Sequence, residues 1–518
     1  MSIKRYTANA DTTITNAFES NLRFRGTGSN MGQSDVLEVF SIYGQADSGS
    51  TELSRTLVKF PIDEISSDRS SSVIPVSGNV NFVLKVYNAR HSLSLPKDYT
   101  LMVQSVSRSW EEGNGLDMEG YTDLTWDLVG ANWTNAASGT TWTSVGGDYW
   151  DDTSSSFSMS FDKGNEDLEI DITTLVEQWL SSSTNRATAN DLGFKANYGV
   201  GIMLTASNEV YFTTSDGEDS GSVPYNIKGA KESYYTKKFF ARGSEYFFKR
   251  PVLEAQWDSS IKDNRGSFII SSSLADAKDN LNTLWLYNRV RGQLKNIPSV
   301  GTGSIYVRLY TSSSAGENLT TAAPYNLKGS GSLTISSAQS AITGGHVSSG
   351  TYSASFAVNT TASTLFDRWF SGSNVYFTGT FDTNDLVAGN TNIHTSYYTT
   401  VSNLKNTYMR DESARFRIYV RPKDWSPNTY TVASKDVSTS IIEDAYFRIY
   451  RTIDELGVVE YGTGSAHHTR LSYDVSGNYF DFSMDLLEAG FMYGIKLLYK
   501  MPDGKYKEQP ETFKFRVD

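Results

Sequence analysis

Short runs in which apolar and polar residues alternate recur along the whole chain, and turn-forming Gly, Ser, Asn and Asp residues separate them. Alternation with a period of two places the apolar side chains on one face of a β-strand. Turn signals of this kind stand at 26–30 and 329–332. Many short strands joined by such turns are typical of β-sandwiches and barrels. The clearest runs are residues 80–87, 304–310, 414–420 and 447–450.

Helical patterns are scarce. The clearest covers residues 172–180, where the apolar side chains share one face at helical spacing and Asp171 can cap the first turn. A second, shorter pattern covers residues 364–370. The alternating strand–helix pattern of a Rossmann or TIM fold is missing. We therefore expect an all-β chain with one or two short helices.

The length predicts several domains. The chain has 518 residues, and at about 100–200 residues per domain it should form two to four hydrophobic cores. Polar residues at 258–266 and an Asn-rich stretch at 382–392 are the predicted linkers. The predicted domains are residues 1–260, followed by two smaller β-sandwich (Ig-like) domains at 266–381 and 394–518.

Composition excludes several classes of function. The chain has no cysteine, which removes disulfides, thiol nucleophiles, Fe–S clusters and cysteine zinc sites. It carries 46 Lys and Arg against 58 Asp and Glu, a net charge of −12, which argues against nucleic acid as the main partner. No apolar run approaches the roughly 20 residues that span a bilayer, so no membrane partner is expected. The polar sequence after the first five residues predicts no secretory signal.

No enzyme motif stands out. The five histidines form no His-Glu-x-x-His pattern, and a Gly-x-Ser-x-Gly elbow and a Gly-Lys-Ser/Thr phosphate loop are also missing. Glu111 and Glu112, with Asp117 and Glu119 nearby, could be paired carboxylates for glycoside hydrolysis. That chemistry needs two carboxyl groups about 5–10 Å apart across a cleft, which proximity in a loop does not provide. We expect a non-enzymatic protein without a cofactor.

Two acidic runs, at 162–167 and 216–219, could hold calcium, because hard cations favour several carboxylate and carbonyl oxygens in one turn. Neither run matches the helix-flanked EF-hand loop. Solvated turns are the preferred interpretation, and no metal site is predicted.

A series of motifs runs through the first half of the chain. They are DTTI at 11–14, SRTLVKFPI at 54–62, WEEG at 110–113, TW at 125–126, DITTLVEQW at 171–179, GIML at 201–204, FTTS at 212–215 and RPVL at 250–253. Their shared order resembles the DNRLRE-domain family, which is also called disaggregatase-related and is similar to some carbohydrate-binding modules. The resemblance implies a jelly-roll-like β-sandwich with one short helix.

The stretch 224–249 departs from that family pattern as an insertion before the last motif. The whole chain also resembles virion structural proteins of T4-like marine bacteriophages, and residues 1–43 and 234–251 carry this second resemblance. It implies a particle protein, assembled in the host cytoplasm, in which C-terminal β-sandwich domains follow the first domain.

Basic and aromatic residues gather at 228–250 in an otherwise acidic chain. Protein–protein interfaces are enriched in aromatic residues and Arg, so this segment is the predicted interface. A surface that stacks nucleic-acid bases is disfavoured by the net charge. Ordinary strands of the sandwich are the structural alternative, and they are compatible with an interface. The interface candidates are Tyr234, Tyr235, Lys237, Lys238, Phe239, Phe240, Arg242, Tyr246, Phe247, Phe248 and Arg250.

Four aromatic residues, Trp133, Trp142, Tyr149 and Trp150, lie in Ser-, Gly-, Thr- and Asp-rich sequence. They are the candidate carbohydrate-binding residues, since exposed aromatic patches mark binding surfaces. Packing of these loops onto the sandwich is the alternative.

The sequence supports two main hypotheses. The first is a virion structural protein, in a tail, neck or baseplate accessory position or as a capsid decoration, which docks to other virion proteins and to copies of itself. The second is a carbohydrate-binding module that adheres to surface polysaccharide. Exposure of Trp133, Trp142 and Trp150 on one face would favour the second. A polysaccharide-degrading enzyme is a third class, but it lacks a motif.

Overall fold

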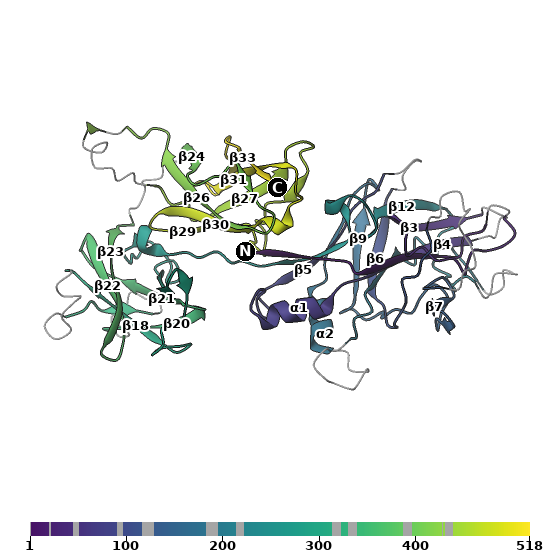
Figure 1. Cartoon of the computed structure of the whole chain (residues 1–518), viewed down its shortest axis with the longest axis horizontal. Coiled ribbons are helices and arrows are strands. Elements are labelled where there is room, and N and C mark those ends of the chain that lie inside the picture. Colours follow the sequence, from purple (N-terminus) through teal and green to yellow (C-terminus); the bar gives the residue numbers. More distant parts are fainter. Residues whose placement is uncertain are drawn as a thin grey trace. The chain divides into compact units, whose positions relative to one another are not determined.

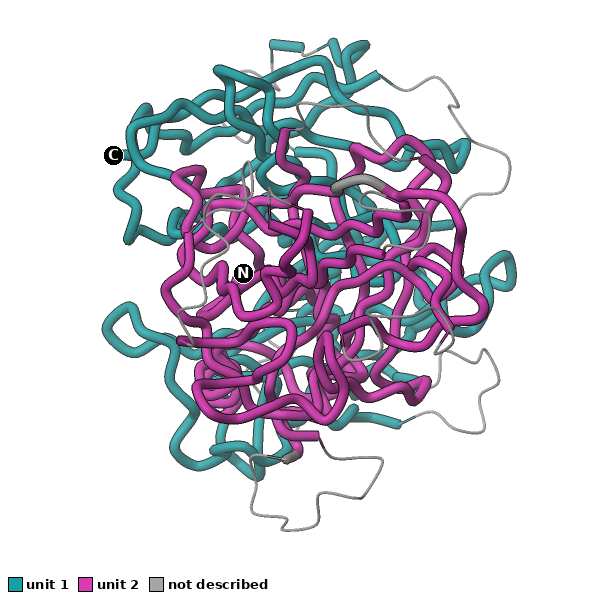
Figure 2. Tube along the Cα trace, turned by 90° about the vertical axis from the view of Figure 1, so that its right-hand side faces the viewer, with its two compact units in different colours: residues 1, 259–518 teal, residues 2–258 magenta. Residues whose placement is uncertain are grey.

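The computed structural model describes residues 2–19, 22–44, 51–90, 97–116, 129–182, 195–213, 222–312, 323–329, 339–386, 396–426, 428–429 and 439–518. Residues 2–258 and residues 259–518 form two compact units (Figures 1 and 2). Both units are built almost entirely of β-strands, which confirms the predicted all-β sandwich class.

Residues 2–258 have a jelly-roll framework. Its consecutive strands pass between two facing sheets in the order that defines a double Greek key. One sheet has the order β1 (Ile3–Thr7), β13 (Val252–Gln256), β5 (Asn81–Val86), β10 (Leu168–Asp171). The facing framework strands are β4 (Thr51–Lys59), β11 (Val200–Leu204), β6 (Tyr99–Ser105) and β9 (Ser156–Phe161).

Further strands extend this framework. The second sheet continues from β4 through β3 (Val36–Tyr43) to β12 (Tyr234–Phe240), and β2 (Ala10–Thr15) also pairs with β4. A small hairpin of β7 (Asn135–Ala137) and β8 (Thr140–Thr141) stands apart. The stretch 224–249 therefore contributes the edge strand β12, followed by a 3-10 turn, η3 (Phe247–Lys249).

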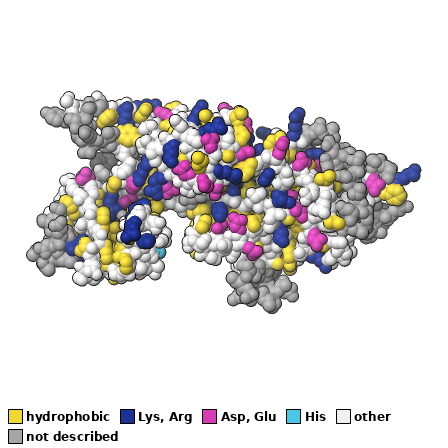
Figure 3. Space-filling model, in the orientation of Figure 1, with side chains coloured by type: hydrophobic (Ala, Val, Ile, Leu, Met, Phe, Trp, Pro, Cys, Tyr) yellow, Lys and Arg dark blue, Asp and Glu magenta, His cyan; other side chains and the backbone are white. Residues whose placement is uncertain are grey.

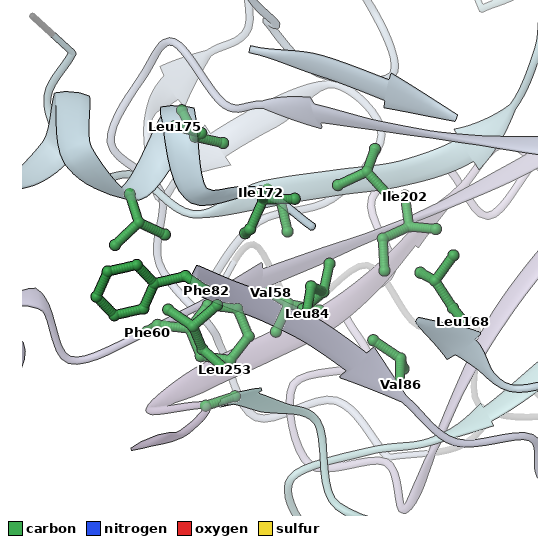
Figure 4. Packing of buried hydrophobic residues seen from close by; sticks show 14 of the residues in the cluster. Val58, Phe60, Phe82, Leu84, Val86, Leu168, Ile172, Leu175, Ile202 and Leu253 are labelled. Carbon is green, nitrogen blue, oxygen red and sulfur yellow. The ribbon is translucent and has the colours of Figure 1, made fainter. Parts of the chain in front are cut away.

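The main core of this unit lies between the two sheets. Figure 4 shows Phe82, Leu84 and Leu253 of one sheet directed toward Val58 and Ile202 of the other. All five side chains are buried. Because every second residue of these strands points inward, the period of two in the sequence is the direct cause of this core.

Two helices close the sandwich. The predicted helix forms as α2 (Thr173–Ser182), and the Asp171 carboxylate accepts a 2.8 Å hydrogen bond from the Thr173 N–H. The other, α1 (Ile62–Ser70), was not predicted, although Asp63 and Glu64 in its first turn and Arg69 in its last turn favour it through the helix dipole. Figure 1 shows the two helices near one another, in agreement with their contacts.

The predicted helix at 364–370 is wrong, because these residues form a β-strand, β22 (Thr364–Ser371). Leu365, Asp367 and Trp369 face the core of their domain, while Phe366 and Phe370 lie on the other face of the strand. Apolar residues on both faces of a strand imitate the spacing of a buried helix, so periodicity alone misassigns them.

Residues 268–384 form one eight-stranded sheet that curls on itself. Its order is β14 (Phe268–Ile269), β23 (Asn374–Asn384), β22, β18 (Ile305–Tyr310), β20 (Ile342–Ser348), β21 (Thr351–Val358), β15 (Asn282–Tyr287), with β19 (Leu327–Lys328) paired to β21. The Asn282 side chain bonds both the N–H and the C=O of Ile269, at 2.9 and 2.8 Å, so the two edges of the sheet meet. A separate hairpin joins β16 (Arg289–Val290) and β17 (Gln293–Leu294).

Residues 397–517 form a two-sheet sandwich whose strand order matches an immunoglobulin domain. One sheet has the order β24 (Tyr397–Val401), β26 (Ser413–Pro422), β30 (Gly477–Ser483), β29 (Ser472–Asp474). The other has the order β25 (Thr407–Tyr408), β33 (Phe513–Val517), β31 (Met492–Lys500), β27 (Ala445–Arg451), β28 (Gly457–Val459), with β32 (Tyr506–Glu508) on β31. The rings of Phe447 and Phe480 stack between the two sheets with their centroids 4.1 Å apart.

A tyrosine at the start of β31 fixes the chain before it. The Tyr493 hydroxyl donates to the Glu488 carbonyl at 2.7 Å and accepts from the Glu488 N–H at 3.0 Å. This arrangement is the tyrosine corner of immunoglobulin-type sandwiches.

The segment that leads into these two domains is held by hydrogen bonds. Arg265, in the turn η4 (Asn264–Gly266), donates to the Asp263 and Asp367 carboxylates and to the Trp285 carbonyl. Asn264 donates to the Tyr473 hydroxyl of β29. The predicted linker at 258–266 is therefore ordered. Of the second predicted linker, residues 382–384 belong to β23 and residues 387–392 lie outside the described residues.

The tyrosine corner predicts a specific loss of stability. Tyr493→Phe leaves the Glu488 N–H and C=O without their side-chain partner, and should lower the free energy of unfolding by about 1–3 kcal/mol. Urea unfolding monitored by circular dichroism measures this change. Tyr398→Phe is the matched control, because Tyr398 is 45% exposed on β24 of the same domain. Equal unfolding midpoints for the two variants would contradict the prediction.

Candidate interaction surface

The predicted interface segment contains residues that face inward. β12 pairs with β3 at the edge of its sheet, and alternation along β12 buries Lys237 and Phe239. Lys238 pairs with Glu38 on β3 at 2.6 Å. Lys237 and Phe239 are thus wrong as interface residues, because they belong to the interior of the sandwich. The side chain of Tyr235 lies outside the described part of the chain, and Tyr234 packs partly buried against the core.

The Lys237 ammonium is enclosed by oxygen atoms and aromatic rings. Its Nζ donates to Asn88 Oδ1 at 2.5 Å and to the carbonyls of Gly164 and Glu166 at 2.9 and 2.8 Å. It also lies over the rings of Phe161 and Phe239. Burial lowers the pKa of Lys237 to about 8.

This contact explains the acidic run at 162–167. Carbonyls of the run bind the Lys237 ammonium, and the Glu166 carboxylate accepts from the N–H groups of Asp162 and Lys163 at 3.2 and 2.7 Å. Two carbonyls of this run are therefore already used as acceptors by a lysine of the same chain. The other acidic run, 216–219, lies outside the described residues.

Arg242 is a structural residue and not a free anchor. Its guanidinium binds both Glu112 carboxylate oxygens at 2.8 and 2.9 Å, and its backbone N–H donates to the Asp11 carboxylate at 2.5 Å. The Asp11 N–H in turn donates to Glu112 at 2.9 Å. Glu112 is thus held in an ion pair with Arg242. Asp117 and Glu119 lie outside the described residues.

Four aromatic residues and one arginine of the segment remain as interface candidates. We call them the 240–250 patch: Phe240, Tyr246, Phe247, Phe248 and Arg250. Tyr246 is 55% exposed and its ring meets that of Phe240 edge-on at 5.3 Å. Phe247 and Phe248 meet edge-on at 5.1 Å. Arg250 is anchored through Nε to the Ser244 carbonyl at 2.9 Å. Tyr246 is the exposed member of the patch, and the other four residues are partly buried.

The carbohydrate-binding prediction is wrong for Trp133 and Trp142, because both are buried. Their indole N–H groups donate to the carbonyls of Ser222 and Asn132, at 2.6 and 2.8 Å. They belong to a second core with the partly buried Tyr149. The polar residues around them supply turns and hydrogen-bond acceptors. Trp150 is half-buried, with the Lys195 ammonium 5.4 Å from its ring.

A buried ion pair that the sequence did not reveal supports this second core. Arg55 binds Glu209 through two hydrogen bonds of 3.0 and 2.9 Å. Its guanidinium lies over the rings of Trp133 and Tyr149, at 5.6 and 5.8 Å. The tryptophan face that could have stacked on a sugar is therefore covered by an arginine of the same chain.

Few groups in the described residues have the geometry of a catalytic or metal site. No three His, Asp or Glu side chains of those residues converge as metal ligands.

A hollow of about 500 Å³ lies between α1 and α2. It is lined mainly by serines and by the Arg69–Glu177 pair, whose two hydrogen bonds measure 2.6 and 2.7 Å. Neither α-helix of the described chain has the length and apolar character needed to cross a bilayer.

Charges of both signs are mixed on the face of the molecule shown in Figure 3. On the face shown in Figure 3, Lys and Arg side chains lie among Asp and Glu side chains. Such a mixed face lacks the continuous basic stripe that binds a phosphate backbone.

Comparison with known proteins finds only weak matches to solved structures. No protein-family model and no curated protein matches the chain. The adhesin InvE of Yersinia pseudotuberculosis matches at 10% identity and a TM-score of 0.15, over 48% of this chain and 56% of that chain. The Ig1-2 module of the Drosophila receptor protein tyrosine phosphatase DLAR matches at 7% identity and a TM-score of 0.14, over 50% of this chain and 95% of that chain. Similarity this low carries no argument about function, and the fold class rests on the strand order.

The Asp11 carboxyl predicts a pH dependence. Burial raises its pKa to about 7, from a usual value near 3.8, and the Glu112 charge adds to the shift. Because the folded state binds this proton more tightly than the unfolded state, the stabilisation is complete below about pH 4 and is lost as the pH rises through 7. Asp11→Asn keeps an acceptor for the Arg242 N–H but cannot ionise. Between pH 4.5 and 8, the wild type should lose about 1–3 kcal/mol of stability relative to this variant.

Urea unfolding at both pH values measures the difference. The control is Asp35→Asn, which changes an exposed aspartate of the same unit. Its free energy of unfolding should depend on pH as that of the wild type does. A wild type and an Asp11→Asn variant with parallel pH dependence would refute the assignment.

Proposed function

We propose that the chain is a non-enzymatic structural protein of a bacteriophage particle. It acts by docking to other virion proteins and to its own copies, in a tail, neck or baseplate accessory position or as a capsid decoration. The sequence resemblances to DNRLRE domains and to phage virion proteins support the particle assignment. The described part of the chain is compatible with a docking role, since it consists of a jelly roll, a curled eight-stranded sheet and an immunoglobulin-type sandwich.

The observation that carries the docking proposal is the 240–250 patch. Tyr246 is exposed while its ring packs edge-on against the partly buried Phe240, and the next two residues, Phe247 and Phe248, pack on each other. A rigid aromatic side chain loses little conformational entropy on binding, and Tyr and Arg are enriched at the centres of interfaces. The patch continues from the end of β12 along the chain, and the exposure of Tyr246 leaves its side chain accessible to a neighbouring protein.

A carbohydrate-binding role has less support. Trp133 and Trp142 are buried, so Trp150 is the one half-exposed tryptophan among the three candidates. A glycan screen with Trp150→Ala as control tests this alternative, and a glycan bound through Trp150 would favour it over the docking role.

Incorporation into particles tests the proposal. Tyr246→Ser should lower the number of chains per particle about tenfold or more, since removal of a central interface residue typically costs 2 kcal/mol or more, roughly a thirtyfold loss of affinity. Mass spectrometry of particles purified from an infected host measures the number. The matched control is Tyr225→Ser, because Tyr225 is a 60% exposed tyrosine of the same unit outside the patch.

Two outcomes would count against the proposal. A chain that is missing from purified particles would refute the virion role. Equal incorporation of the two variants would refute the docking role of the patch and leave the virion role standing.

A further inference from the structure

Two arginines stand directly opposite one another on the sheet of residues 268–384. In the antiparallel register of β18 and β22, Arg308 pairs with Arg368. The core face of these strands carries Val307, Leu309 and Trp369, so both arginines lie on the opposite face. Figure 1 shows β18, β22 and β23 as neighbouring strands of one sheet.

Neither arginine is neutralised within the described chain. Arg368 is only 4% exposed, yet its Nε and Nη1 atoms have no hydrogen-bond partner, and the same holds for Nε of Arg308. No carboxylate of the described residues forms an ion pair with either guanidinium. Directly opposed side chains of an antiparallel pair have their Cβ atoms about 4.5–5.5 Å apart, and like charges at this spacing are destabilising. A buried cation without a partner adds a further cost.

The surroundings of the pair suit a negatively charged ligand. Arg308 lies 4.6 Å from the ring of Phe370, which fixes the direction of its guanidinium. On the neighbouring strand β23, the exposed Thr378 lies opposite Arg368. Tyr306 and Phe370 are the next opposed pair on the same face of β18 and β22, with ring centroids 5.8 Å apart, and Tyr306 is 37% exposed. Aromatic rings beside the two arginines lower the local polarity, which strengthens charge interactions there.

From this arrangement we propose that Arg308 and Arg368 form a binding site for an oxyanion, a carboxylate or a phosphate group. The planar guanidinium fork matches both groups through paired hydrogen bonds. The bound anion would accept hydrogen bonds from the free N–H groups and cancel the repulsion between the arginines. The Thr378 hydroxyl would lie at the solvent-exposed side of the site. The site belongs to a different unit from the 240–250 patch, so it is independent of the proposed function.

Titration of the full chain with inorganic phosphate and with malonate, at constant ionic strength, tests the site. Each anion that binds the folded state should raise the melting temperature with its concentration, and calorimetry should give one saturable site. Arg308→Met and Arg368→Met should each weaken binding about tenfold or more, since each removes a charge-assisted pair. Arg289→Met is the matched control, because Arg289 is an exposed arginine of the same domain, and it should bind as the wild type does.

If the two arginines form an anion site, either methionine variant should melt at or above the wild-type temperature without added anion, because the charge repulsion is relieved. If the arginines only support the fold, both variants should melt below the wild type. Tighter binding of malonate supports a carboxylate ligand, such as an acidic segment of a neighbouring protein, and tighter binding of phosphate supports a phosphate-bearing ligand. The proposal is overturned if the wild type binds neither anion, or if all three variants bind as the wild type does.

Discussion

Aromatic side chains between facing sheets hold the sandwiches of this protein closed. No cysteine is present, so a disulfide cannot pin one sheet to the other. Phe447 stacks on Phe480 across the last domain, and Phe268 of β14 lies 6.1 Å from Phe356 of β21 inside the curled sheet of the domain before it. Such pairs add about 0.5–1.5 kcal/mol each beyond the area they bury. Strand register and the placement of every surface residue depend on this packing, because a sheet that shifts by one residue turns its core face outward.

Buried charges add specificity to this packing. Glu254 on β13 binds Arg5 of β1 and Lys85 of β5, and although burial alone would raise its pKa, the two cations lower it to about 2. Lys237 fixes β12 to the loop at 162–167 through hydrogen bonds to two main-chain carbonyls. Buried ion pairs add little net stability, but breaking one leaves an uncompensated charge, so they penalise alternative strand registers.

The sequence predicts local structure well where one period governs a segment. The strands at 80–87 and 414–420 and the helix at 172–180 form as expected, since their apolar residues face one side only. The candidate site was less predictable because its partners are distant in sequence: Trp133 donates to Ser222, and Lys237 to Asn88. No local pattern reports such contacts. The Arg308–Arg368 pair was missed because residues 364–370 resemble a helix, which hides their pairing with β18.

The first unit also has both of its ends in one place. β1 and β13 are antiparallel neighbours, and the Trp257 N–H donates to the Ser2 carbonyl at 3.0 Å. A unit whose two ends lie close together can be inserted between two neighbouring residues of another protein without separating them far. Domain insertion is tolerated under this condition. The geometry of this jelly roll therefore suits insertion into a surface loop of another protein as well as attachment at a chain end.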